Sequence, residues 1–463
     1  MLLKMNRLVA ALALLALSPG IAQAQREAKM PGLKDAARKA PLPFKVGTAV
    51  SFYGGKGKNG VYSPGILPCP ASDTQRDAAF GKIIAQEFSL IQPGNELKMS
   101  GLWKGVARDG NGKLTAVCDF ANLKTLAAYA APRKLSVRGH VMVYNALYQL
   151  PDSLFAIDWS RQTASLRPEF SPEDVRDALH SYVAQVVRAT LAANAIARRQ
   201  HRISPLFIAW DVTNEAVSDE DSASGVNGFR YPKSDVWRRV GPKGIGGDTE
   251  GYDYVSDVFQ WAEQEMALDI SRHKDGITPA DRFRLYYNDY NGEWNAKKWQ
   301  AIKNLIQHIQ KTGGRVDGIG FQAHLIAGRD DLAQGQFGVS VQESIALGLR
   351  FSITENDFRI QTPPKENALD QQRIWQAQNY AQVGEICRRY AAHCDLYQVW
   401  GCLDEDSWIP ATFPGWGEAT LFTGWNPATN RYEAKMGQPG TSRAYAALLD
   451  ALNGKYTPPQ TGP

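Results

Sequence analysis

The 463-residue chain has few histidines, few cysteines and little net charge. Its seven histidines are scattered, and none lies at metal-ligand spacing from a second histidine or a cysteine. The acidic stretch at residues 219–222 lacks the pattern of a calcium loop. The sequence therefore predicts no catalytic metal, and nothing in it calls for a cofactor.

The chain also lacks basic clusters and, after its first residues, long apolar runs. The formal net charge is only +5, and no lysine and arginine cluster is interleaved with aromatic residues, which argues against a nucleic-acid partner. No run beyond residue 24 is apolar and long enough to span a bilayer. We find no repeat, low-complexity linker or second-domain boundary, and we expect a monomer.

The N-terminus has the form of a secretory signal. Lys4 and Arg7 precede an apolar run at residues 8–17, and Ala22-Gln23-Ala24 has the small-x-small form of a cleavage site. We expect a signal peptide at 1–24, a leader at 25–43 and a single domain at 44–463, in a secreted or periplasmic protein.

Five cysteines are an odd number, so at least one is unpaired within the chain. In an oxidising compartment, the neighbours Cys387 and Cys394 are the first candidates for a disulfide. Cys69 and Cys118 are a second possible pair, which would leave Cys402 free.

Apolar runs of strand length alternate with helical patterns. One helix is predicted to be capped by Ser171 with Pro172 as its first residue, and another over 299–312 to end at Gly313-Gly314. This alternation predicts an α/β fold, a (β/α)₈ TIM barrel with long βα loops. A typical barrel needs about 250 residues, so we place the surplus in loops at 218–251 and 409–437. The runs are 44–50, 90–96, 135–144, 205–209, 283–291, 316–324, 349–355 and 396–401.

Two of these strands end in a carboxyl group. Glu215 follows the fourth run and Glu355 ends the seventh, and only a closed or doubly wound sheet could bring such distant residues together. By itself, Asn214-Glu215 is more typical of a turn that caps the next helix than of a catalytic site. Two carboxyl groups facing each other across a cleft are what acid-assisted cleavage of a glycosidic bond requires.

Seven strand ends carry motifs that together resemble glycoside hydrolase family 10, mostly secreted endo-β-1,4-xylanases on a (β/α)₈ barrel. The resemblance extends from about Phe44 to Leu452 and implies a β-linked polysaccharide or oligosaccharide as substrate. The motifs are Asn95-Glu96-Leu97-Lys98, Arg138-Gly139-His140, Thr213-Asn214-Glu215-Ala216, Asn288-Asp289-Tyr290-Asn291, Gly318 to His324, Ile353-Thr354-Glu355, and Val399-Trp400-Gly401 with Asp406-Ser407-Trp408.

The resemblance implies a role for each matching residue. Glu215 corresponds to the acid/base and Glu355 to the nucleophile of a retaining double displacement. Asn214 would bind the sugar 2-hydroxyl, and His324 would lie between Glu355 and Asp357 and orient the nucleophile. His140 is interpreted as structural. Further sugar-binding positions are Asn95, Glu96, Lys98, Asn145, Tyr290, Gln322, Trp400 and Trp408, with Tyr290 and Gln322 on the floor near Glu355.

The chain departs from the family pattern after the third strand. Tyr144 and Asn145 stand where the family has tryptophan and histidine, residues 146–148 look like an insertion, and a tryptophan expected after 149–151 is absent. Asn356 replaces the usual leucine. An altered glycone specificity, or a noncatalytic carbohydrate-binding barrel, therefore remains an alternative. A phosphate-binding barrel is disfavoured because the stretch at 400–406 is acidic.

Overall fold

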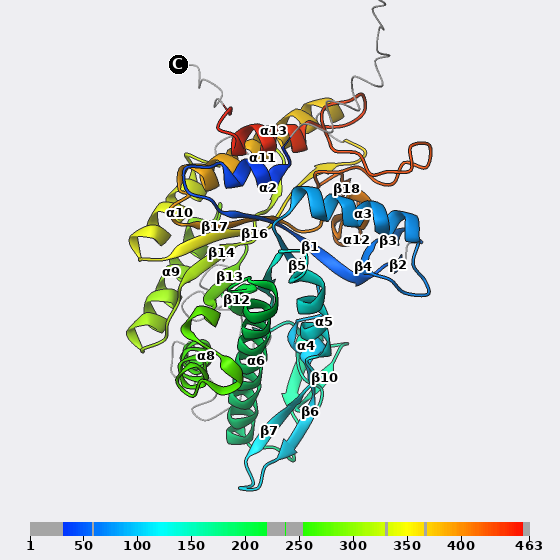
Figure 1. The fold of residues 1–463 in the computed structure, drawn as a ribbon. Helices are drawn as coiled ribbons and strands as arrows, with labels where there is room; N and C mark the ends of the chain where they lie inside the picture. Colours follow the sequence, from blue (N-terminus) through cyan, green and yellow to red (C-terminus); the bar gives the residue numbers. More distant parts are fainter. Residues whose placement is uncertain are drawn as a thin grey trace, which may run out of the picture.

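The computed structural model describes residues 31–57, 60–219, 237, 253–328, 332–364 and 368–456. Within these residues eight parallel strands form a closed ring, in which each strand pairs with the next and β12 pairs with β13 to complete the circle (Figure 1). Each lies at one of the eight predicted runs. They are β1 (Lys45–Tyr53), β5 (Leu90–Pro93), β8 (Ser136–Gly139), β12 (Phe207–Asn214), β13 (Arg284–Asp289), β14 (Gly318–Phe321), β16 (Arg350–Gln361) and β17 (Cys394–Val399).

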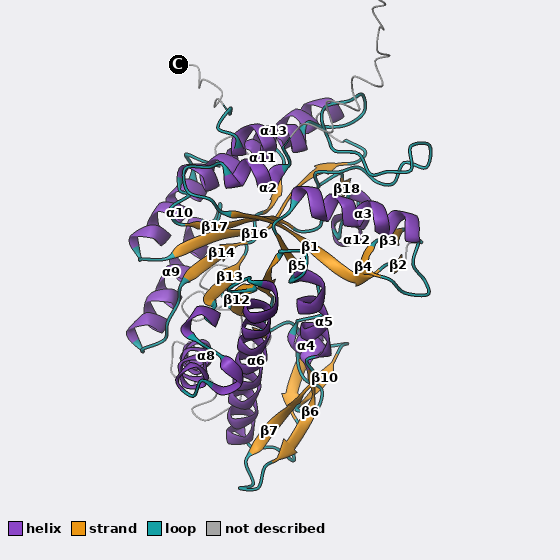
Figure 2. Ribbon diagram, in the orientation of Figure 1, coloured by secondary structure: helices purple, strands orange, loops and turns teal. Residues whose placement is uncertain are grey.

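A helix follows each barrel strand, and the helices surround the strands (Figure 2). The predicted (β/α)₈ barrel is therefore confirmed. The helices are α3 (Thr74–Glu87), α5 (Ala121–Ala130), α6 (Pro172–His201), α8 (Asp253–Ser271), α9 (Ala296–Lys311), α10 (Gln336–Ala346), α11 (Leu369–Arg389) and α13 (Ala444–Leu452).

The predicted helix ends agree closely with the structure. Ser171 accepts the backbone N–H of Asp174 in a capping box, and Pro172 is the first residue of α6. The helix predicted to begin at Trp299 begins three residues earlier, because the Asn295 side chain caps it. It ends at Lys311, before Gly313 with a φ of 90°.

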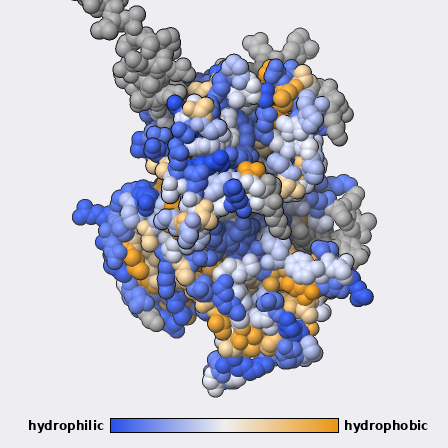
Figure 3. Space-filling view, turned by 90° about the vertical axis from the view of Figure 1, so that its right-hand side faces the viewer, coloured by the Kyte–Doolittle hydropathy of each residue, from blue (hydrophilic) through white to orange (hydrophobic). Residues whose placement is uncertain are grey.

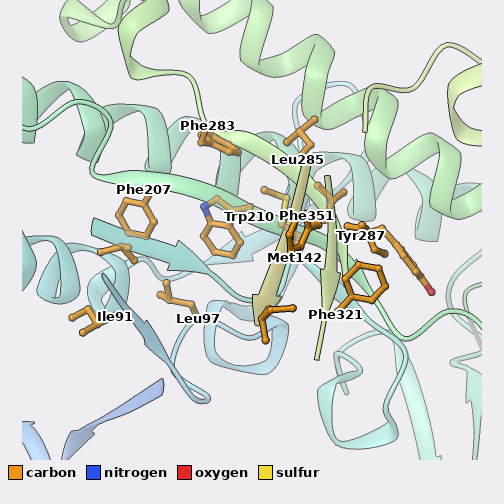
Figure 4. Close-up of a cluster of buried hydrophobic side chains, with 14 of the residues drawn as sticks. Ile91, Leu97, Met142, Phe207, Trp210, Phe283, Leu285, Tyr287, Phe321 and Phe351 are labelled. Carbon is orange, nitrogen blue, oxygen red and sulfur yellow. The ribbon is translucent and has the colours of Figure 1, made fainter. Parts of the chain in front are cut away.

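The ring of strands encloses packed side chains rather than a channel. On the outer face of the ring, Trp210, Leu285 and Phe351 belong to one buried hydrophobic cluster, to which β12, β13 and β16 contribute (Figure 4). Inside the ring, Arg138 and Asp211 form an ion pair beside the Tyr286 ring, and both side chains are almost completely excluded from solvent. Because β12 is buried along nearly its whole length, its register is firmly set.

The loops hold more regular structure than the sequence indicated. Short antiparallel pairs extend from the barrel, and the expected loop at 409–437 contains a short helix and a strand that pairs with β16. The expected loop at 218–251 lies outside the described residues except for 218, 219 and 237. The pairs are β2 (Gly55–Lys56) with β3 (Tyr62–Ser63), β6 (Trp103–Arg108) with β7 (Leu114–Cys118), and β10 (Phe155–Asp158) with β11 (Thr163–Leu166), while the loop contains α12 (Ile409–Thr412) and β18 (Trp416–Gly417).

The segment predicted as a leader contributes to the packed structure. The predicted signal peptide lies outside the described residues, but α2 (Leu33–Arg38) packs against β1 and α13. Leu33, Ala36 and Ala37 are fully buried. No described helix is long and apolar enough to cross a membrane.

The expected disulfides are not formed, since all five cysteines are free thiols. Cys387 in α11 and Cys394 at the start of β17 are neighbours in the core, and their thiol groups interact. The Cys394 thiol donates a hydrogen bond to the Leu396 carbonyl at 3.6 Å. Burial raises the pKa of the Cys387 thiol, which keeps it protonated and unreactive.

The buried position of α2 predicts that Leu33→Ala destabilises the protein. Truncating a fully buried leucine should lower the free energy of unfolding by about 2–5 kcal/mol. Leu42→Ala is the matched control, because Leu42 is 52% exposed in the same segment and its truncation should cost about 0.5 kcal/mol or less. Urea unfolding of both variants measures the difference, and equal stabilities would show that α2 is dispensable.

Candidate active site

A cavity of about 740 Å³ opens near the carboxyl ends of the barrel strands. Figure 3 views the side toward which β1 runs and shows a hydrophilic hollow near its middle. Both predicted glutamates line this cavity, which places their carboxyl groups in one site as the barrel required. The predicted residues that line it are Asn95, Lys98, Asn214, Glu215, Tyr290, Gln322, His324, Glu355, Trp400 and Trp408.

Glu215 stands directly after the last residue of β12. Its φ is 53°, a left-handed conformation that is uncommon for a side chain of this size. Its backbone N–H donates to the Asn288 carbonyl at 2.9 Å, which joins this turn to β13. This hydrogen bond fixes the backbone turn from which the Glu215 side chain enters the cavity.

Among the described residues, neutral donors from Asn214, Gln322 and Tyr144 reach the Glu215 carboxylate. Asn214 Nδ2 and Gln322 Nε2 donate to Oε1 at 3.0 and 2.9 Å. The Tyr144 hydroxyl donates to Oε2 at 2.9 Å. The sequence placed Gln322 on the floor near Glu355, whereas the structure directs its amide to Glu215.

Glu355 is held by different partners and is only 5% exposed. Asn288 Nδ2 donates to its Oε1 at 2.8 Å, and His324 Nε2 lies 3.2 Å from its Oε2. The other ring nitrogen of His324 lies 2.8 Å from Asp357 Oδ2, which also accepts the Trp408 indole N–H at 2.9 Å. The predicted position of His324 between Glu355 and Asp357 is therefore the observed one.

His324 carries a positive charge at neutral pH. Burial lowers the pKa of its imidazole, but the charge and hydrogen bond of Asp357, and then those of Glu355, raise it to about 10. Both ring nitrogens then carry protons and donate to carboxylates on either side. The ring orientation is fixed by two charge-assisted hydrogen bonds.

Asn288 connects the two glutamates. Its Nδ2 donates at 2.8 Å both to Asn214 Oδ1 and to Glu355 Oε1. Its Oδ1 accepts the Thr354 hydroxyl at 2.7 Å, so the amide cannot turn without losing partners. Sequence analysis quoted Asn288 within a motif but did not list it as a site residue.

One wall combines a buried cation with aromatic rings. Lys98 is 7% exposed, and its Nζ donates to Asn95 Oδ1 at 3.1 Å and lies 5.8 Å from the centre of the Trp400 ring. Burial lowers the pKa of Lys98, while Glu355, Glu215 and Glu96 raise it. The half-buried Trp400 ring offers a flat apolar face, and the Lys98 ammonium beside it can donate hydrogen bonds to a sugar hydroxyl.

Two of the predicted sugar-binding residues do not line the cavity. Glu96 turns toward β1, where its carboxylate accepts the Phe52 backbone N–H at 2.8 Å. Asn145 is 5% exposed and does not contribute to the lining of the cavity. His140, interpreted as structural, does bind Asp211 at 2.9 Å, but its ring also lines the cavity.

Some lining residues were missed by the sequence analysis. Tyr144 was noted only as a departure from the family pattern, Asp406 was quoted only within a motif, and Arg359 was not considered. Arg359 lies on β16 with its guanidinium 4.2 Å from the centre of the Phe413 ring. Burial raises the pKa of Asp406 to about 6. The described residues contain no group of His, Cys, Asp or Glu that could hold a metal ion.

A (β/α)₈ barrel with two carboxyl groups in one polar cavity defines a glycoside-hydrolase type of site. Residues 68–436 match the model of Glycosyl hydrolase family 10. The chain therefore belongs to this family.

The relatives and solved structures described below are endo-xylanases. "Endo-1,4-beta-xylanase 5" of Pyricularia oryzae is 28% identical over 356 residues, covering 76% of this chain and 70% of that protein. "Endo-1,4-beta-xylanase B" of Thermotoga neapolitana is 27% identical, covering 74% of this chain and 78% of that protein.

Among solved structures, the Penicillium canescens endo-1,4-beta-xylanase XylE has a TM-score of 0.64 at 24% identity, covering 92% of this chain and 98% of that one. Xylanase 10B from Thermotoga petrophila, in complex with xylobiose, has a TM-score of 0.62 at 23% identity, covering the same shares of both chains. At this level of identity the likeness to the structures bears on the fold.

The contacts of His324 predict that its ring stays protonated well above neutral pH. Because its pKa rises from 6.5 to about 10, the stability it contributes is fully present below about pH 6.5 and is lost as the pH rises through about 10. ¹⁵N NMR of the ring should show both nitrogens protonated at pH 8. Asp357→Asn should lower the pKa of His324, and the urea-unfolded chain gives the reference. A neutral ring at pH 8 in the folded protein would contradict this.

Proposed function

We propose that the protein is a retaining endo-β-1,4-xylanase that cleaves xylan or a related hemicellulose by double displacement. The observation that carries this proposal is the pair Glu215 and Glu355, which line one cavity and are linked through Asn288. Each carboxyl group has partners suited to a different task.

In the first step, Glu355 attacks the anomeric carbon of the sugar while Glu215 gives its proton to the departing glycosidic oxygen. The glycosidic bond breaks and a bond forms between the sugar and a Glu355 oxygen. In the second step, Glu215 takes a proton from water, whose oxygen attacks the same carbon and releases Glu355. Two inversions restore the original configuration.

The residues around the glutamates support this chemistry. His324 directs a charged N–H at Glu355, which fixes the attacking oxygen in place. Asn214 already donates to Glu215 and lies where it could meet the 2-hydroxyl of a sugar in the cavity. We propose that Lys98, Asn95 and the Trp400 and Trp408 rings bind the sugars on either side, with Tyr290 as a further contact.

The choice of β-1,4-xylosidic bonds rests on the family and on the names of its relatives, which are endo-1,4-beta-xylanases. Tyr144 and Tyr148 belong to the segment that departs from the family pattern, and both line the cavity, which supports the alternative of a β-glycosidase with an altered glycone. A noncatalytic carbohydrate-binding barrel is disfavoured, because both glutamates and Asn214 remain in the cavity. We further propose that the protein acts in the periplasm or outside the cell.

The first test is the hydrolysis of xylans, xylo-oligosaccharides and aryl β-glycosides. ¹H NMR of the initial product should show the β-anomer, as retention requires. An initial α-anomer would mean inversion. Release of the aryl group from aryl glucosides but not from aryl xylosides would favour the alternative with an altered glycone specificity.

Glu355→Gln should reduce kcat on xylo-oligosaccharides by at least about 10³-fold with the fold intact. The amide is nearly isosteric but is a poor nucleophile, so no glycosyl-enzyme can form. Glu343→Gln is the matched control, because Glu343 lies on α10 outside the cavity and pairs with Lys303 at 2.9 Å. Comparable rates in both variants would remove Glu355 from the mechanism.

A further inference from the structure

Tyr144 occupies an unusual place in the site. It is the last residue of β9 (Val143–Tyr144), a short strand that pairs in parallel with β12. In this register Tyr144 lies opposite Asn214, the residue before Glu215. The half-buried phenol ring lines the cavity, and its hydroxyl donates to Glu215 Oε2 at 2.9 Å.

The described residues donate to both oxygens of Glu215. The amides of Asn214 and Gln322 reach Oε1, from β12 and from the residue after β14. The Tyr144 hydroxyl reaches Oε2 from a third element. Its ring packs edge-on against Tyr148, with centroids 6.1 Å apart, which limits its rotation.

We propose that Tyr144 is a positioning residue that sets the proton affinity of Glu215 and the orientation of its Oε2. This inference rests on the proposed function, in which Glu215 is the acid/base. It also gives a role to the tyrosine that stands where the family has tryptophan.

The physical reason is the charge of the acceptor. A hydrogen bond donated to an ionised carboxylate is stronger than one to a neutral carboxylic acid. A phenol ordinarily titrates near pH 10, so Tyr144 keeps its proton while Glu215 titrates. The bond therefore favours the ionised form of Glu215 and lowers its pKa relative to the same site without the hydroxyl.

The two halves of the reaction use this bond differently. The first step needs Glu215 protonated, and the tyrosine then faces a neutral acid. Once the proton has moved to the leaving oxygen, Glu215 is ionised and the Tyr144 hydrogen bond strengthens. The bond thus stabilises the form of Glu215 that must accept a proton from water in the second step.

Other charged groups also influence the pKa of Glu215, and substitution of Tyr144 leaves these groups unchanged. Within the described residues these are Lys98, whose charge interacts with it, and Asp289 on β13, which repels it. Glu355 and the charged His324 line the same cavity. Tyr144→Phe removes one hydroxyl and leaves this charge set in place.

The test is the pH dependence of kcat/KM on a xylo-oligosaccharide for the wild type and Tyr144→Phe. The alkaline limb reports the pKa of the essential acid in the free enzyme. Loss of a hydrogen bond to the charged form should move this limb upward by about one pH unit. ¹³C NMR of labelled glutamate, assigned by comparison with Glu215→Gln, should give the same shift without turnover.

Tyr53→Phe is the control, because Tyr53 is 58% exposed at the end of β1 and lies outside the cavity. It should leave both the limb and the rate unchanged. Tyr144→Leu serves as a second variant, since it keeps apolar bulk and offers no hydrogen-bond donor. Thermal unfolding checks that each variant is folded.

An alkaline limb and a Glu215 titration that do not move in either folded Tyr144 variant would overturn the inference. A lower kcat/KM with an unchanged limb would do the same, because it would mean a packing role alone. If the wild type cleaves none of the β-glycosides, the proposed function fails instead, and the NMR titration still decides whether Tyr144 acts on Glu215.

Discussion

The site depends on the pairing of β12 with β13, which closes the barrel. That pairing sets Asn214 opposite Asn288, and the Asn288 amide then donates to both Asn214 and Glu355. Glu215 follows Asn214 in a left-handed turn whose N–H binds the Asn288 carbonyl. One residue of β13 thus relates the two glutamates through its main chain and its side chain. A shift of one residue in this register would turn the side chains of β12 to the opposite face and separate the pair.

The sequence predicts the barrel well because its signals are local. Each strand is a short apolar run that ends in polar residues, and the strand ends of a barrel meet at one face whatever the loops do. Glu215 and Glu355 could therefore be assigned to one cavity without any contact being known. The placing of His324 between two carboxyl groups came from the family resemblance, since a lone histidine has no such signature.

Other features depend on tertiary contacts that no local pattern records. The burial of α2 follows from its packing on β1 and α13, which lie far apart in the chain. Its position next to Asn95 in the sequence predicts that Glu96 lines the cavity, yet its carboxylate accepts a hydrogen bond from a backbone N–H of β1. Cys387 and Cys394 are close in sequence and in space, but both remain thiols. The direction of Gln322 toward Glu215 is a choice of side-chain geometry, which sequence spacing leaves open.

The two glutamates have chemically different surroundings, and this difference suits their proposed roles. Glu355 faces the full positive charge of His324, whose pKa of about 10 keeps it charged across the range in which a glycosidase works. Glu215 is held at both oxygens by neutral donors, two amides and a phenol. A hydrogen bond from a cation to a carboxylate is stronger than one from a neutral donor. Within the described residues, the His324 imidazolium lies against Glu355 while amides and a phenol lie against Glu215, and such a difference in surroundings is what separates an acid from a nucleophile.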